Sequence, residues 1–390
     1  MQERIVEKPK VLICVDWFVP GYKAGGPIQS CKNLVQGLKD QVDFHILTSD
    51  RDWGEPQPYA GIATDTWLTY DGNVPVLYAS PAFLTLQNLE KLIRDIQPDC
   101  IYLNSMFSVK YTIFPLVLRL RNRVNSRIIL APRGMLQGGA LSFKPLKKKI
   151  YLKLINLLGL PAKIEFHATD ELEAMNIRKQ FPGYKKIHII GNFPSFDPVI
   201  KKELNKEAGK LKLVYLSRIS PEKNLLLILQ LLNSRTFEGD IELTIGGKVK
   251  DEVYYAECLK EADKLPANIQ VHFAGAVPHE RVLEWLQQFH VFILPTFGEN
   301  FGHAIFEAFL AGRPVIISDR TLWRGLEEKG IGWDIPLDDT EKYINTLNTT
   351  LNMTQEEYTT WSDRSRDFAE NYRKSNENSS RYLELFQSTG

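Results

Sequence analysis

The sequence predicts an α/β protein made of two doubly wound, Rossmann-like domains with parallel sheets. At 390 residues the chain is too long for one ordinary hydrophobic core, so two domains are expected. Short apolar runs of strand character alternate with helical stretches on both sides of a polar, proline-containing segment at 193–210. The composition, 44% hydrophobic and 24% charged, is typical of a soluble globular chain.

The first domain is expected at residues 1–192. It opens with an apolar strand at 10–17, a glycine loop, a helix at 28–39 and a second strand at 44–48, which is how a parallel α/β sheet begins. The alternation continues to a last short strand at 187–192. After the linker at 193–210, a second alternation fills a domain at 211–350, and polar helices follow at 351–390.

The most informative stretch runs from His290 to Asp319. It predicts a buried strand, a loop, a short helix and a second buried strand. Glu299 lies in the loop and Glu307 lies in the helix, so the two carboxylates bracket the helix N-terminus. That end carries free backbone N–H groups and partial positive charge, which suit a phosphate, while a carboxylate accepts hydrogen bonds from vicinal sugar hydroxyls.

The motif GENFGHAIFEAFLAGRPVI resembles the Glu-x7-Glu signature of retaining glycosyltransferases of family 4. The resemblance implies the GT-B fold, in which two Rossmann-like domains face a cleft and the last helix crosses back to the first domain. The first domain would then bind the acceptor and the second the nucleotide sugar. The form APRGML at 131–136 resembles a bacterial subgroup associated with surface polysaccharide assembly.

The resemblance also implies roles for single residues. Arg218 and Lys223 follow a buried strand and would neutralise the donor diphosphate and stabilise it as a leaving group. Glu299 would contact the donor sugar, and Glu307 would hold the ribose hydroxyls. The backbone N–H groups of three loop residues would donate to the donor; these are Asn300, Phe301 and Gly302.

Two glycine pairs are weaker candidates for the donor site. Gly25 and Gly26 can bring backbone N–H groups close to a phosphate, although they do not form the G-x-G-x-x-G fingerprint. Gly246 and Gly247 end a predicted strand and could lie beside the nucleotide. For both pairs a plain tight turn is an equally good interpretation.

Arg133 occupies the place where many members of this family carry a histidine facing the reaction centre. An arginine cannot act as a general base, so an acid–base role for that loop is in doubt. We expect Arg133 to bind an acceptor phosphate or the donor diphosphate instead.

A basic amphipathic stretch lies at 142–160. From Cys100 to Ile164 the chain has 12 Lys+Arg and no Asp or Glu. Such a stretch is typical of a helix on an anionic membrane surface, with Lys147, Lys148 and Lys149 as the contacts; a core helix with a solvated lysine face is the alternative. The first ten residues lack a signal-peptide core and no apolar run is long enough to span a bilayer, so we expect a cytoplasmic protein, peripheral on the inner membrane face.

No cofactor or metal is expected. The four cysteines are scattered without metal-ligand spacing, which indicates buried reduced thiols. Asp50-Arg51-Asp52 matches the D-x-D metal pattern of the other main glycosyltransferase fold, but no partner ligand is evident in the sequence. The expected partners are a nucleoside-diphosphate sugar and a saccharide or lipid-linked acceptor, and no nucleic acid.

Two other classes remain open. One is a catalytically silent partner subunit that keeps the fold and binds a saccharide; the intact set Glu299, Glu307, Arg218 and Lys223 argues against it. The other is a nucleotide-sugar epimerase or dehydrogenase of Rossmann type. The missing dinucleotide fingerprint and the absence of a suitably placed Tyr-x-x-x-Lys pair argue against that class.

Overall fold

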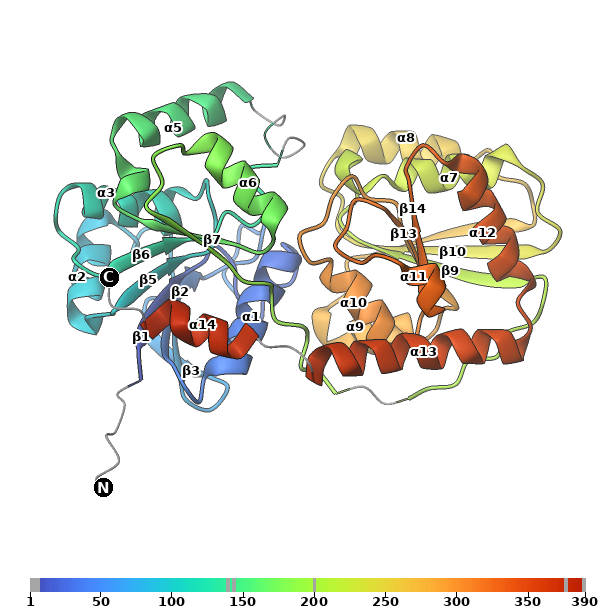
Figure 1. The fold of residues 1–390 in the computed structure, drawn as a ribbon, viewed down its shortest axis with the longest axis horizontal. Helices are drawn as coiled ribbons and strands as arrows, with labels where there is room; N and C mark the ends of the chain where they lie inside the picture. Colours follow the sequence, from blue (N-terminus) through green and yellow to red (C-terminus); the bar gives the residue numbers. More distant parts are fainter. Residues whose placement is uncertain (1–7, 138–140, 142–144, 199–200, 375–377, 388–390) are drawn as a thin grey trace. The chain divides into compact units, whose positions relative to one another are not determined.

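The structure is a computed structural model that describes residues 8–137, 141, 145–198, 201–374 and 378–387. It divides into two compact units, 1–193 with 377–390 and 194–376. The chain therefore enters the second unit once and returns, so that the last helix belongs to the first unit, as the resemblance implied (Figure 1).

The first unit is built on an eight-stranded sheet in the order β3-β4-β2-β1-β5-β6-β7-β8. The strands are β1 (Lys10–Cys14), β2 (Asp43–Ser49), β3 (Trp67–Tyr70), β4 (Val74–Ala79), β5 (Cys100–Leu103), β6 (Arg127–Leu130), β7 (Glu165–Ala168) and β8 (Lys186–Ile189). Among these strands only β3 is antiparallel to its neighbour. The sequence did not predict β3, because its half-exposed residues lack an apolar run.

Helices cover both faces of this sheet. They are α1 (Gly26–Leu38), α2 (Leu86–Ile96), the π-helical turn η1 (Val109–Ile113) with α3 (Phe114–Leu120), α5 (Pro145–Leu157), η2 (Leu160–Ala162), α6 (Glu171–Gln180) and α14 (Asn378–Gln387). Successive residues of β1 enter different cores, since Val11 and Ile13 pack with α1 and α14 while Leu12 and Cys14 pack on the other face. The sheet is thus buried on both sides, as a parallel sheet requires.

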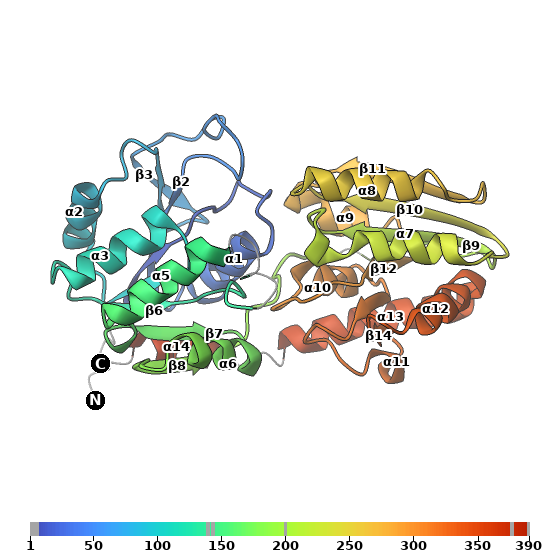
Figure 2. The same ribbon diagram turned by 90° about the horizontal axis from the view of Figure 1, so that it is seen from above.

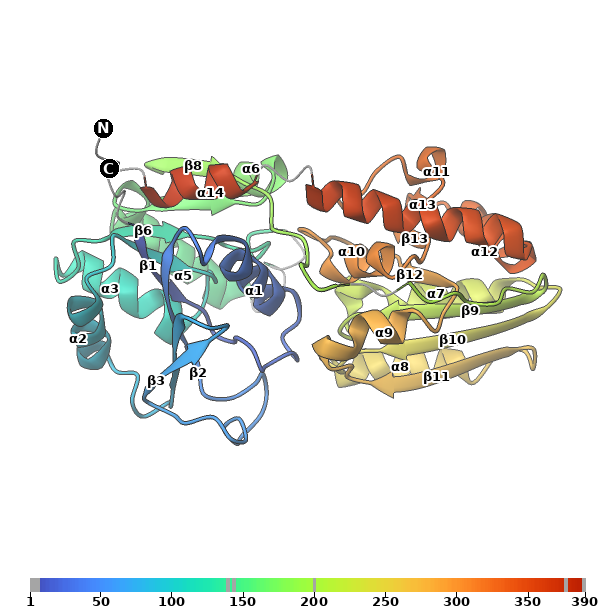
Figure 3. The same ribbon diagram turned by 90° about the horizontal axis from the view of Figure 1, so that it is seen from below.

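The second unit has a six-stranded parallel sheet in the order β11-β10-β9-β12-β13-β14. The strands are β9 (Lys210–Leu216), β10 (Asp240–Gly246), β11 (Ile269–Gly275), β12 (Val291–Leu294), β13 (Val315–Ser318) and β14 (Gly332–Ile335). The helical elements are η3 (Pro221–Lys223), α7 (Leu225–Ser234), α8 (Glu252–Ala262), η4 (His279–Arg281), α9 (Val282–Leu286), α10 (His303–Leu310), α11 (Leu326–Lys329), α12 (Thr340–Asn352) and α13 (Gln355–Lys374). Figures 2 and 3 show α7 and α8 on one face, with α9, α10 and α13 on the other.

One predicted helix of the second unit is divided. The sequence predicted a continuous helix at 222–232, but a short 3-10 turn ends at Lys223 and α7 begins at Leu225. Asn224 between them has a left-handed backbone, φ +56°, which asparagine tolerates better than most residues. Because of this break, Lys223 belongs to the turn after β9 and not to α7, and that turn is part of the candidate site.

Candidate functional site

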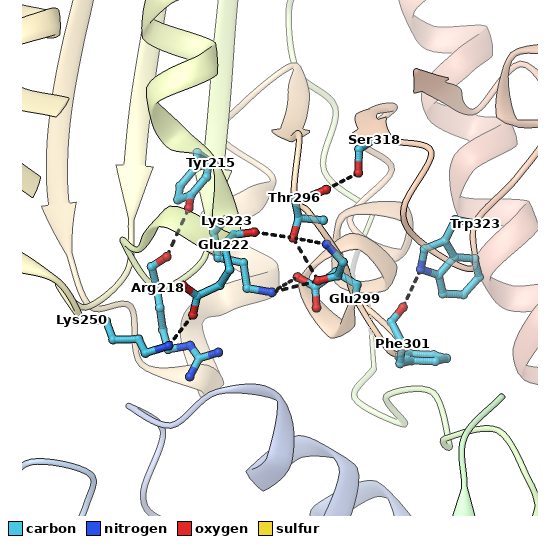
Figure 4. A network of polar contacts seen from close by, with 11 residues as sticks. Tyr215, Arg218, Glu222, Lys223, Lys250, Thr296, Glu299, Phe301, Ser318 and Trp323 are labelled. Atoms are coloured by element: carbon cyan, nitrogen blue, oxygen red, sulfur yellow. Dashed lines mark hydrogen bonds and ion pairs between the residues drawn. The ribbon is translucent and has the colours of Figure 1, made fainter. Parts of the chain in front are cut away.

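The candidate site lies where the strand order of the second sheet changes direction. From β9 the chain proceeds to β10 and β11 on one side, and then returns to β12 on the other side of β9. The loops after β9 and β12 therefore leave the same sheet edge in neighbouring positions, and open α/β sheets bind ligands at such a point. Arg218 and Lys223 come from the first loop and Glu299 from the second (Figure 4).

Hydrogen bonds connect the two loops. The backbone N–H of Phe297 donates to the carbonyl oxygen of Glu222 at 3.0 Å, and the Thr296 hydroxyl lies 3.1 Å from the same oxygen. The Ser318 hydroxyl, at the end of β13, donates to the carbonyl of Thr296. The sequence analysis missed Thr296 and Ser318; their only signal was a hydroxyl residue near the end of each apolar run.

Lys223 and Glu299 form an ion pair at the centre of the site. The Lys223 ammonium nitrogen lies 2.6 Å from Oε1 of Glu299, with the two side chains 9% and 18% exposed. The same nitrogen is 3.5 Å from the carbonyl oxygen of Gly298. A nearly buried ammonium group needs a partner of opposite charge, and Glu299 supplies it while its own carboxylate is held in place.

Arg218 differs from Lys223 because its guanidinium makes no hydrogen bond or ion pair with any residue that the structure describes. Its backbone is held instead, since the Tyr215 hydroxyl donates to the Arg218 carbonyl at 3.2 Å. The carboxylate of the neighbouring Glu222 forms an ion pair with Lys250. Burial opposes ionisation of Glu222, but the bond from Lys250 and the charge of Arg218 lower its pKa, so it stays ionised. A half-exposed guanidinium beyond a strand end can therefore accept an anionic ligand.

Helix α10 begins beside Glu299 without a side-chain cap. Gly302 precedes the helix with a left-handed backbone, φ +74°, and a Cβ there would lie 2.8 Å from Cδ1 of Ile305. Phe301 is anchored, because its carbonyl accepts from Trp323 Nε1 at 2.7 Å and its ring packs among Phe306, Trp323 and Tyr372. The first turn of α10 thus presents its partial positive charge from a rigid base.

Glu307 lies in the second turn of α10, buried, with its side chain 6% exposed. Nδ1 of His279 lies 3.7 Å from Oε1 of Glu307. His279 belongs to η4, after β11, and the sequence analysis did not select it. The available signal was a histidine in the loop VPHER that follows a strand of the same sheet.

Gly246 and Gly247 have clear packing roles. A Cβ on Gly247, at φ +140°, would lie 1.8 Å from the carbonyl oxygen of Ser217. A Cβ on Gly246 would lie 2.6 Å from the indole of Trp285. Close approach of the chain to the loop after β9 accounts for Gly247, and packing of Trp285 from α9 accounts for Gly246, without a ligand.

The remaining predicted residues belong to the first unit. Gly25, at φ +71°, precedes α1, and Gly26 is its first residue; a Cβ on Gly25 would meet nothing within 4 Å. Tyr22 supplies the carbonyl that accepts from the N–H of Gly25 at 3.0 Å. The loop is thus a turn that ends at an uncapped helix start.

The Arg133 guanidinium is fully engaged within the first unit. Its Nε donates to Asn104, one terminal nitrogen donates to Asn192, and the other donates to the Tyr102 hydroxyl at 2.8 Å. The Tyr102 hydroxyl in turn lies 2.6 Å from Nδ1 of His167. Arg133, which the sequence predicted to contact a phosphate, thus connects the ends of β5 and β6 with Asn192, just before the chain enters the second unit.

The carboxylates of Asp50 and Asp52 have structural partners. Asp50 pairs with the guanidinium of Arg51 at 2.7 Å. Asp52 accepts from the backbone N–H groups of Tyr22, Lys23 and Trp53. In the described part of the chain, no group of three His, Cys, Asp or Glu side chains is arranged to hold a metal ion.

Helix α5 carries an exposed apolar stripe. Its buried side rests on Leu152 and Ile155, while five other residues are between 43 and 85% exposed, namely Leu146, Ile150, Leu154, Leu157 and Leu158. Lys147, Lys149 and Lys153 are exposed beside this stripe, and Lys148 lies 5.1 Å from the Phe107 ring. Ser142, Phe143 and Lys144, which the sequence placed at the start of this helix, lie outside the described residues.

Comparison with known proteins identifies the second unit. Residues 196–373 match the family model described as Glycosyl transferases group 1, and this segment is a group 1 glycosyltransferase domain. The match spans less than half of the chain. No curated protein sequence matches the chain significantly.

Solved structures share the whole fold. HepE from Anabaena, in complex with UDP and glucose, has a TM-score of 0.66 at 15% identity, with 98% of this chain and 100% of that chain covered. Sucrose-phosphate synthase from Thermosynechococcus elongatus gives 0.67 at 15% identity, covering 98% of each chain. WaaG, a glycosyltransferase involved in lipopolysaccharide biosynthesis, gives 0.63 at 11% identity, covering 97% of this chain and 100% of that one. The chain has the GT-B fold.

Proposed function

We propose that the protein is a retaining glycosyltransferase of family 4 that moves a sugar from a nucleoside-diphosphate donor to a hydroxyl group of an acceptor. One observation carries the proposal: Lys223 pairs with Glu299 just before α10, and Arg218 extends from the adjoining loop after β9 (Figure 4), at the strand-order reversal of a group 1 glycosyltransferase domain. A cationic strand end and a positive helix end suit a diphosphate.

Each residue of the site binds a different part of the donor. Arg218, which has no protein partner among the described residues, binds the diphosphate first, and Lys223 adds a second positive charge. Glu299 accepts hydrogen bonds from hydroxyls of the transferred sugar, and Glu307 accepts them from the ribose. The glycine-led start of α10, at Asn300, Phe301 and Gly302, offers backbone donors next to the phosphates.

Substitution on the same face of the sugar fits this arrangement. Glu299 is held by Lys223 at 2.6 Å, which suits a hydrogen-bond acceptor better than an attacking nucleophile. The bond between the anomeric carbon and the phosphate oxygen breaks as the acceptor oxygen bonds to that carbon from the same side. The departing phosphate oxygen takes the acceptor proton, and the cations stabilise the charge that develops on it.

The donor is tested by a thermal-shift screen with UDP, GDP, dTDP and ADP. UDP is the first candidate because HepE is described in complex with UDP. A bound nucleotide stabilises the protein by about 2.7 kcal/mol at a hundredfold excess over its Kd. The Glu307→Gln variant should keep its own melting temperature and lose most of the nucleotide-dependent shift; an unchanged shift would remove Glu307 from the site.

A silent binding subunit is distinguished by slow hydrolysis of the donor. Purified enzyme should release nucleoside diphosphate from UDP-glucose or another nucleotide sugar, whereas a non-catalytic protein should release none. We propose that this activity needs no metal, because Asp50 and Asp52 are occupied by other partners. Activity should persist in EDTA, and recovery that depends on added Mg²⁺ or Mn²⁺ would contradict this.

For the acceptor we propose a saccharide or lipid-linked saccharide used in bacterial surface polysaccharide assembly. The support is the APRGML resemblance and the likeness in fold to WaaG and to WaaB, described as a lipopolysaccharide outer core galactosyltransferase. A lipid-linked acceptor would be met at a membrane surface. No helix in the described part of the chain is long and apolar enough to cross a membrane.

We propose that α5 docks on the anionic inner surface of the cell membrane. Its apolar stripe would enter the interface, and Lys147 and Lys149 would lie near lipid phosphates, each contributing on the order of 1 kcal/mol. Lys148 was also predicted as a contact, but it lies over the Phe107 ring on the side of the helix that faces the protein. The stripe, at 146, 150, 154 and 157, follows helical spacing on the side away from Leu152 and Ile155.

Vesicle flotation tests the docking. The protein should float with vesicles that contain phosphatidylglycerol and remain unbound with phosphatidylcholine alone. Neutralising Lys147 and Lys149 to Gln, or changing Ile150 and Leu154 to Ser, should each abolish flotation, whereas Lys260→Gln on α8 should not. Flotation that is indifferent to both changes on α5 would refute the proposal.

A further inference from the structure

His279 connects the buried carboxylate of Glu307 with the segment through which the chain enters the second unit. Its Nδ1 lies 3.7 Å from Oε1 of Glu307, and its Nε2 lies 3.2 Å from Oδ2 of Asp197. The imidazole is itself only 14% exposed. One ring thus bridges two carboxylates, one on α10 and one in the entering segment.

The entering segment is fixed at this point by other contacts. The Ser195 hydroxyl is 3.1 Å from Oδ2 of Asp197 and accepts from the Asp197 backbone N–H at 3.1 Å. Arg373, near the end of α13, donates to the Asp197 carbonyl at 2.7 Å. Asp197 is therefore held by both the beginning and the end of the second unit, which makes it a firm support for His279.

The distance between His279 and Glu307 determines whether the carboxylate can still accept hydrogen bonds from a ligand. At 3.7 Å it is longer than a hydrogen bond, so the imidazole packs against the carboxylate oxygen and orients it without occupying its lone pair. A carboxylate that binds a vicinal diol must direct both oxygens at the hydroxyls. Two support points, the α10 backbone and the imidazole, determine that direction better than the helix alone.

We infer that His279 is a positioning residue that orients Glu307 toward the ribose hydroxyls of the donor and makes the entering segment at Ser195–Asp197 respond to nucleotide binding. The inference rests on the proposed function, because it assigns the ribose to Glu307. It adds His279 to the donor site and links Glu307 with the entering segment, and binding of the donor by itself requires neither.

Discrimination between UDP and its 2′-deoxy analogue tests the positioning role. Loss of a hydrogen bond from a hydroxyl to a charged group costs roughly tenfold or more in affinity, so the wild-type protein should bind UDP about tenfold more tightly than 2′-deoxy-UDP. Glu307→Gln should reduce that ratio to near one, and His279→Gln should reduce it to about two- to threefold. His272→Gln is the matched control, an exposed histidine on β11 that should leave the ratio unchanged.

Hydrogen exchange of the peptide containing Ser195–Asp197 tests the link. UDP should slow its exchange in the wild type and in His272→Gln, but not in His279→Gln. Asp197→Asn is a second variant, which leaves His279 and Glu307 in place; it should lose the slowing of exchange while keeping most of the UDP affinity.

The outcomes separate the two proposals. If wild-type protein binds none of UDP, GDP, dTDP and ADP, the proposed function fails, and the role of His279 fails with it. If a nucleotide binds and His279→Gln keeps both the full ribose discrimination and the slowed exchange, the proposed function stands and the inference about His279 is overturned. Should another nucleotide bind in place of UDP, its ribose and deoxyribose forms replace the pair above.

Discussion

Arg133 and Arg218 both lie just after the end of a parallel strand, yet the structure gives them different surroundings. Each follows the carboxyl end of a parallel strand, β6 in the first unit and β9 in the second. Arg133 donates to Asn104, Asn192 and Tyr102, whereas the Arg218 guanidinium has no hydrogen bond or ion pair among the described residues.

The difference lies in the partners, not in the position. A guanidinium that already has three acceptors gains little from a phosphate, because binding would require those acceptors to be given up. A half-exposed guanidinium beside an ionised glutamate that is itself paired elsewhere has donors to offer. A cation at a strand end is therefore a ligand-binding candidate only after its protein partners are counted.

Replacing Arg218 should produce the largest effect. The Arg218→Met variant should lose about 10²- to 10³-fold in kcat/KM for donor hydrolysis, because a charge on the leaving diphosphate is left unstabilised. Its free energy of unfolding should stay within about 0.5 kcal/mol of wild type, as for surface changes. Denaturant unfolding and initial rates measure the two quantities, and a variant that is destabilised but active would reverse the comparison.

Replacing Arg133 should produce the opposite pattern. The Arg133→Met variant leaves Asn104, Asn192 and Tyr102 without their donor inside the first unit, which should lower the free energy of unfolding by about 3 kcal/mol. Donor hydrolysis by the fraction that remains folded should change little. If the variant unfolds normally but loses acceptor-dependent turnover, Arg133 contacts the acceptor, as the sequence suggested.

The two units can also be compared through their buried histidines, for which the expected change in the free energy of unfolding is smaller. Burial lowers the pKa of His167 in the first unit to about 3, helped by the charge of Arg133, and lowers the pKa of His290 in the second unit to about 4. Both rings are neutral in the folded protein, so the stability they contribute is complete above the unfolded pKa near 6.5 and is lost as the pH falls below it.

Denaturant unfolding at pH 7, 6 and 5 measures this dependence. Each histidine should contribute a decrease approaching 1.4 kcal/mol per pH unit below pH 6, in the unit that contains it. His167→Gln should reduce the slope for the first unit only, and His290→Gln for the second only. Equal slopes in wild type and variants would mean that the rings take up protons while the protein is folded.

Much of the fold could be predicted from the sequence because buried parallel strands have a simple pattern. VFIL is apolar throughout and VIIS is apolar up to its final serine, and the glycine after α10 marks the end of that helix. Strands with weak patterns were missed: β3 has half-exposed residues, and β14 begins with a glycine. A π-helical turn from Val109 precedes α3, because Ser108 caps it, and no local pattern indicates such a turn.

The site was predictable only where chemistry is local in sequence. Glu299 and Glu307 lie in one motif, and Arg218 and Lys223 lie in another, so their local pattern and the family resemblance indicated them. The pairing of Lys223 with Glu299 joins residues 76 positions apart, and the contact of His279 with Glu307 depends on how η4 packs beside α10. Such contacts follow from tertiary packing, which one sequence does not encode in any local pattern.

The return of α14 to the first unit has a consequence for how the chain is made. Tyr382 and Phe386 stack or pack edge-on against Phe193, Phe44 and Tyr102, so the first unit lacks part of its core until the last helix has been synthesised. The second unit, at 194–376, is continuous and can complete its core while the ribosome is still translating the end of the message. The amino-terminal half should therefore be the last part to become protease-resistant during translation, and a stop codon before Asn378 should expose that half to degradation while leaving the second unit intact.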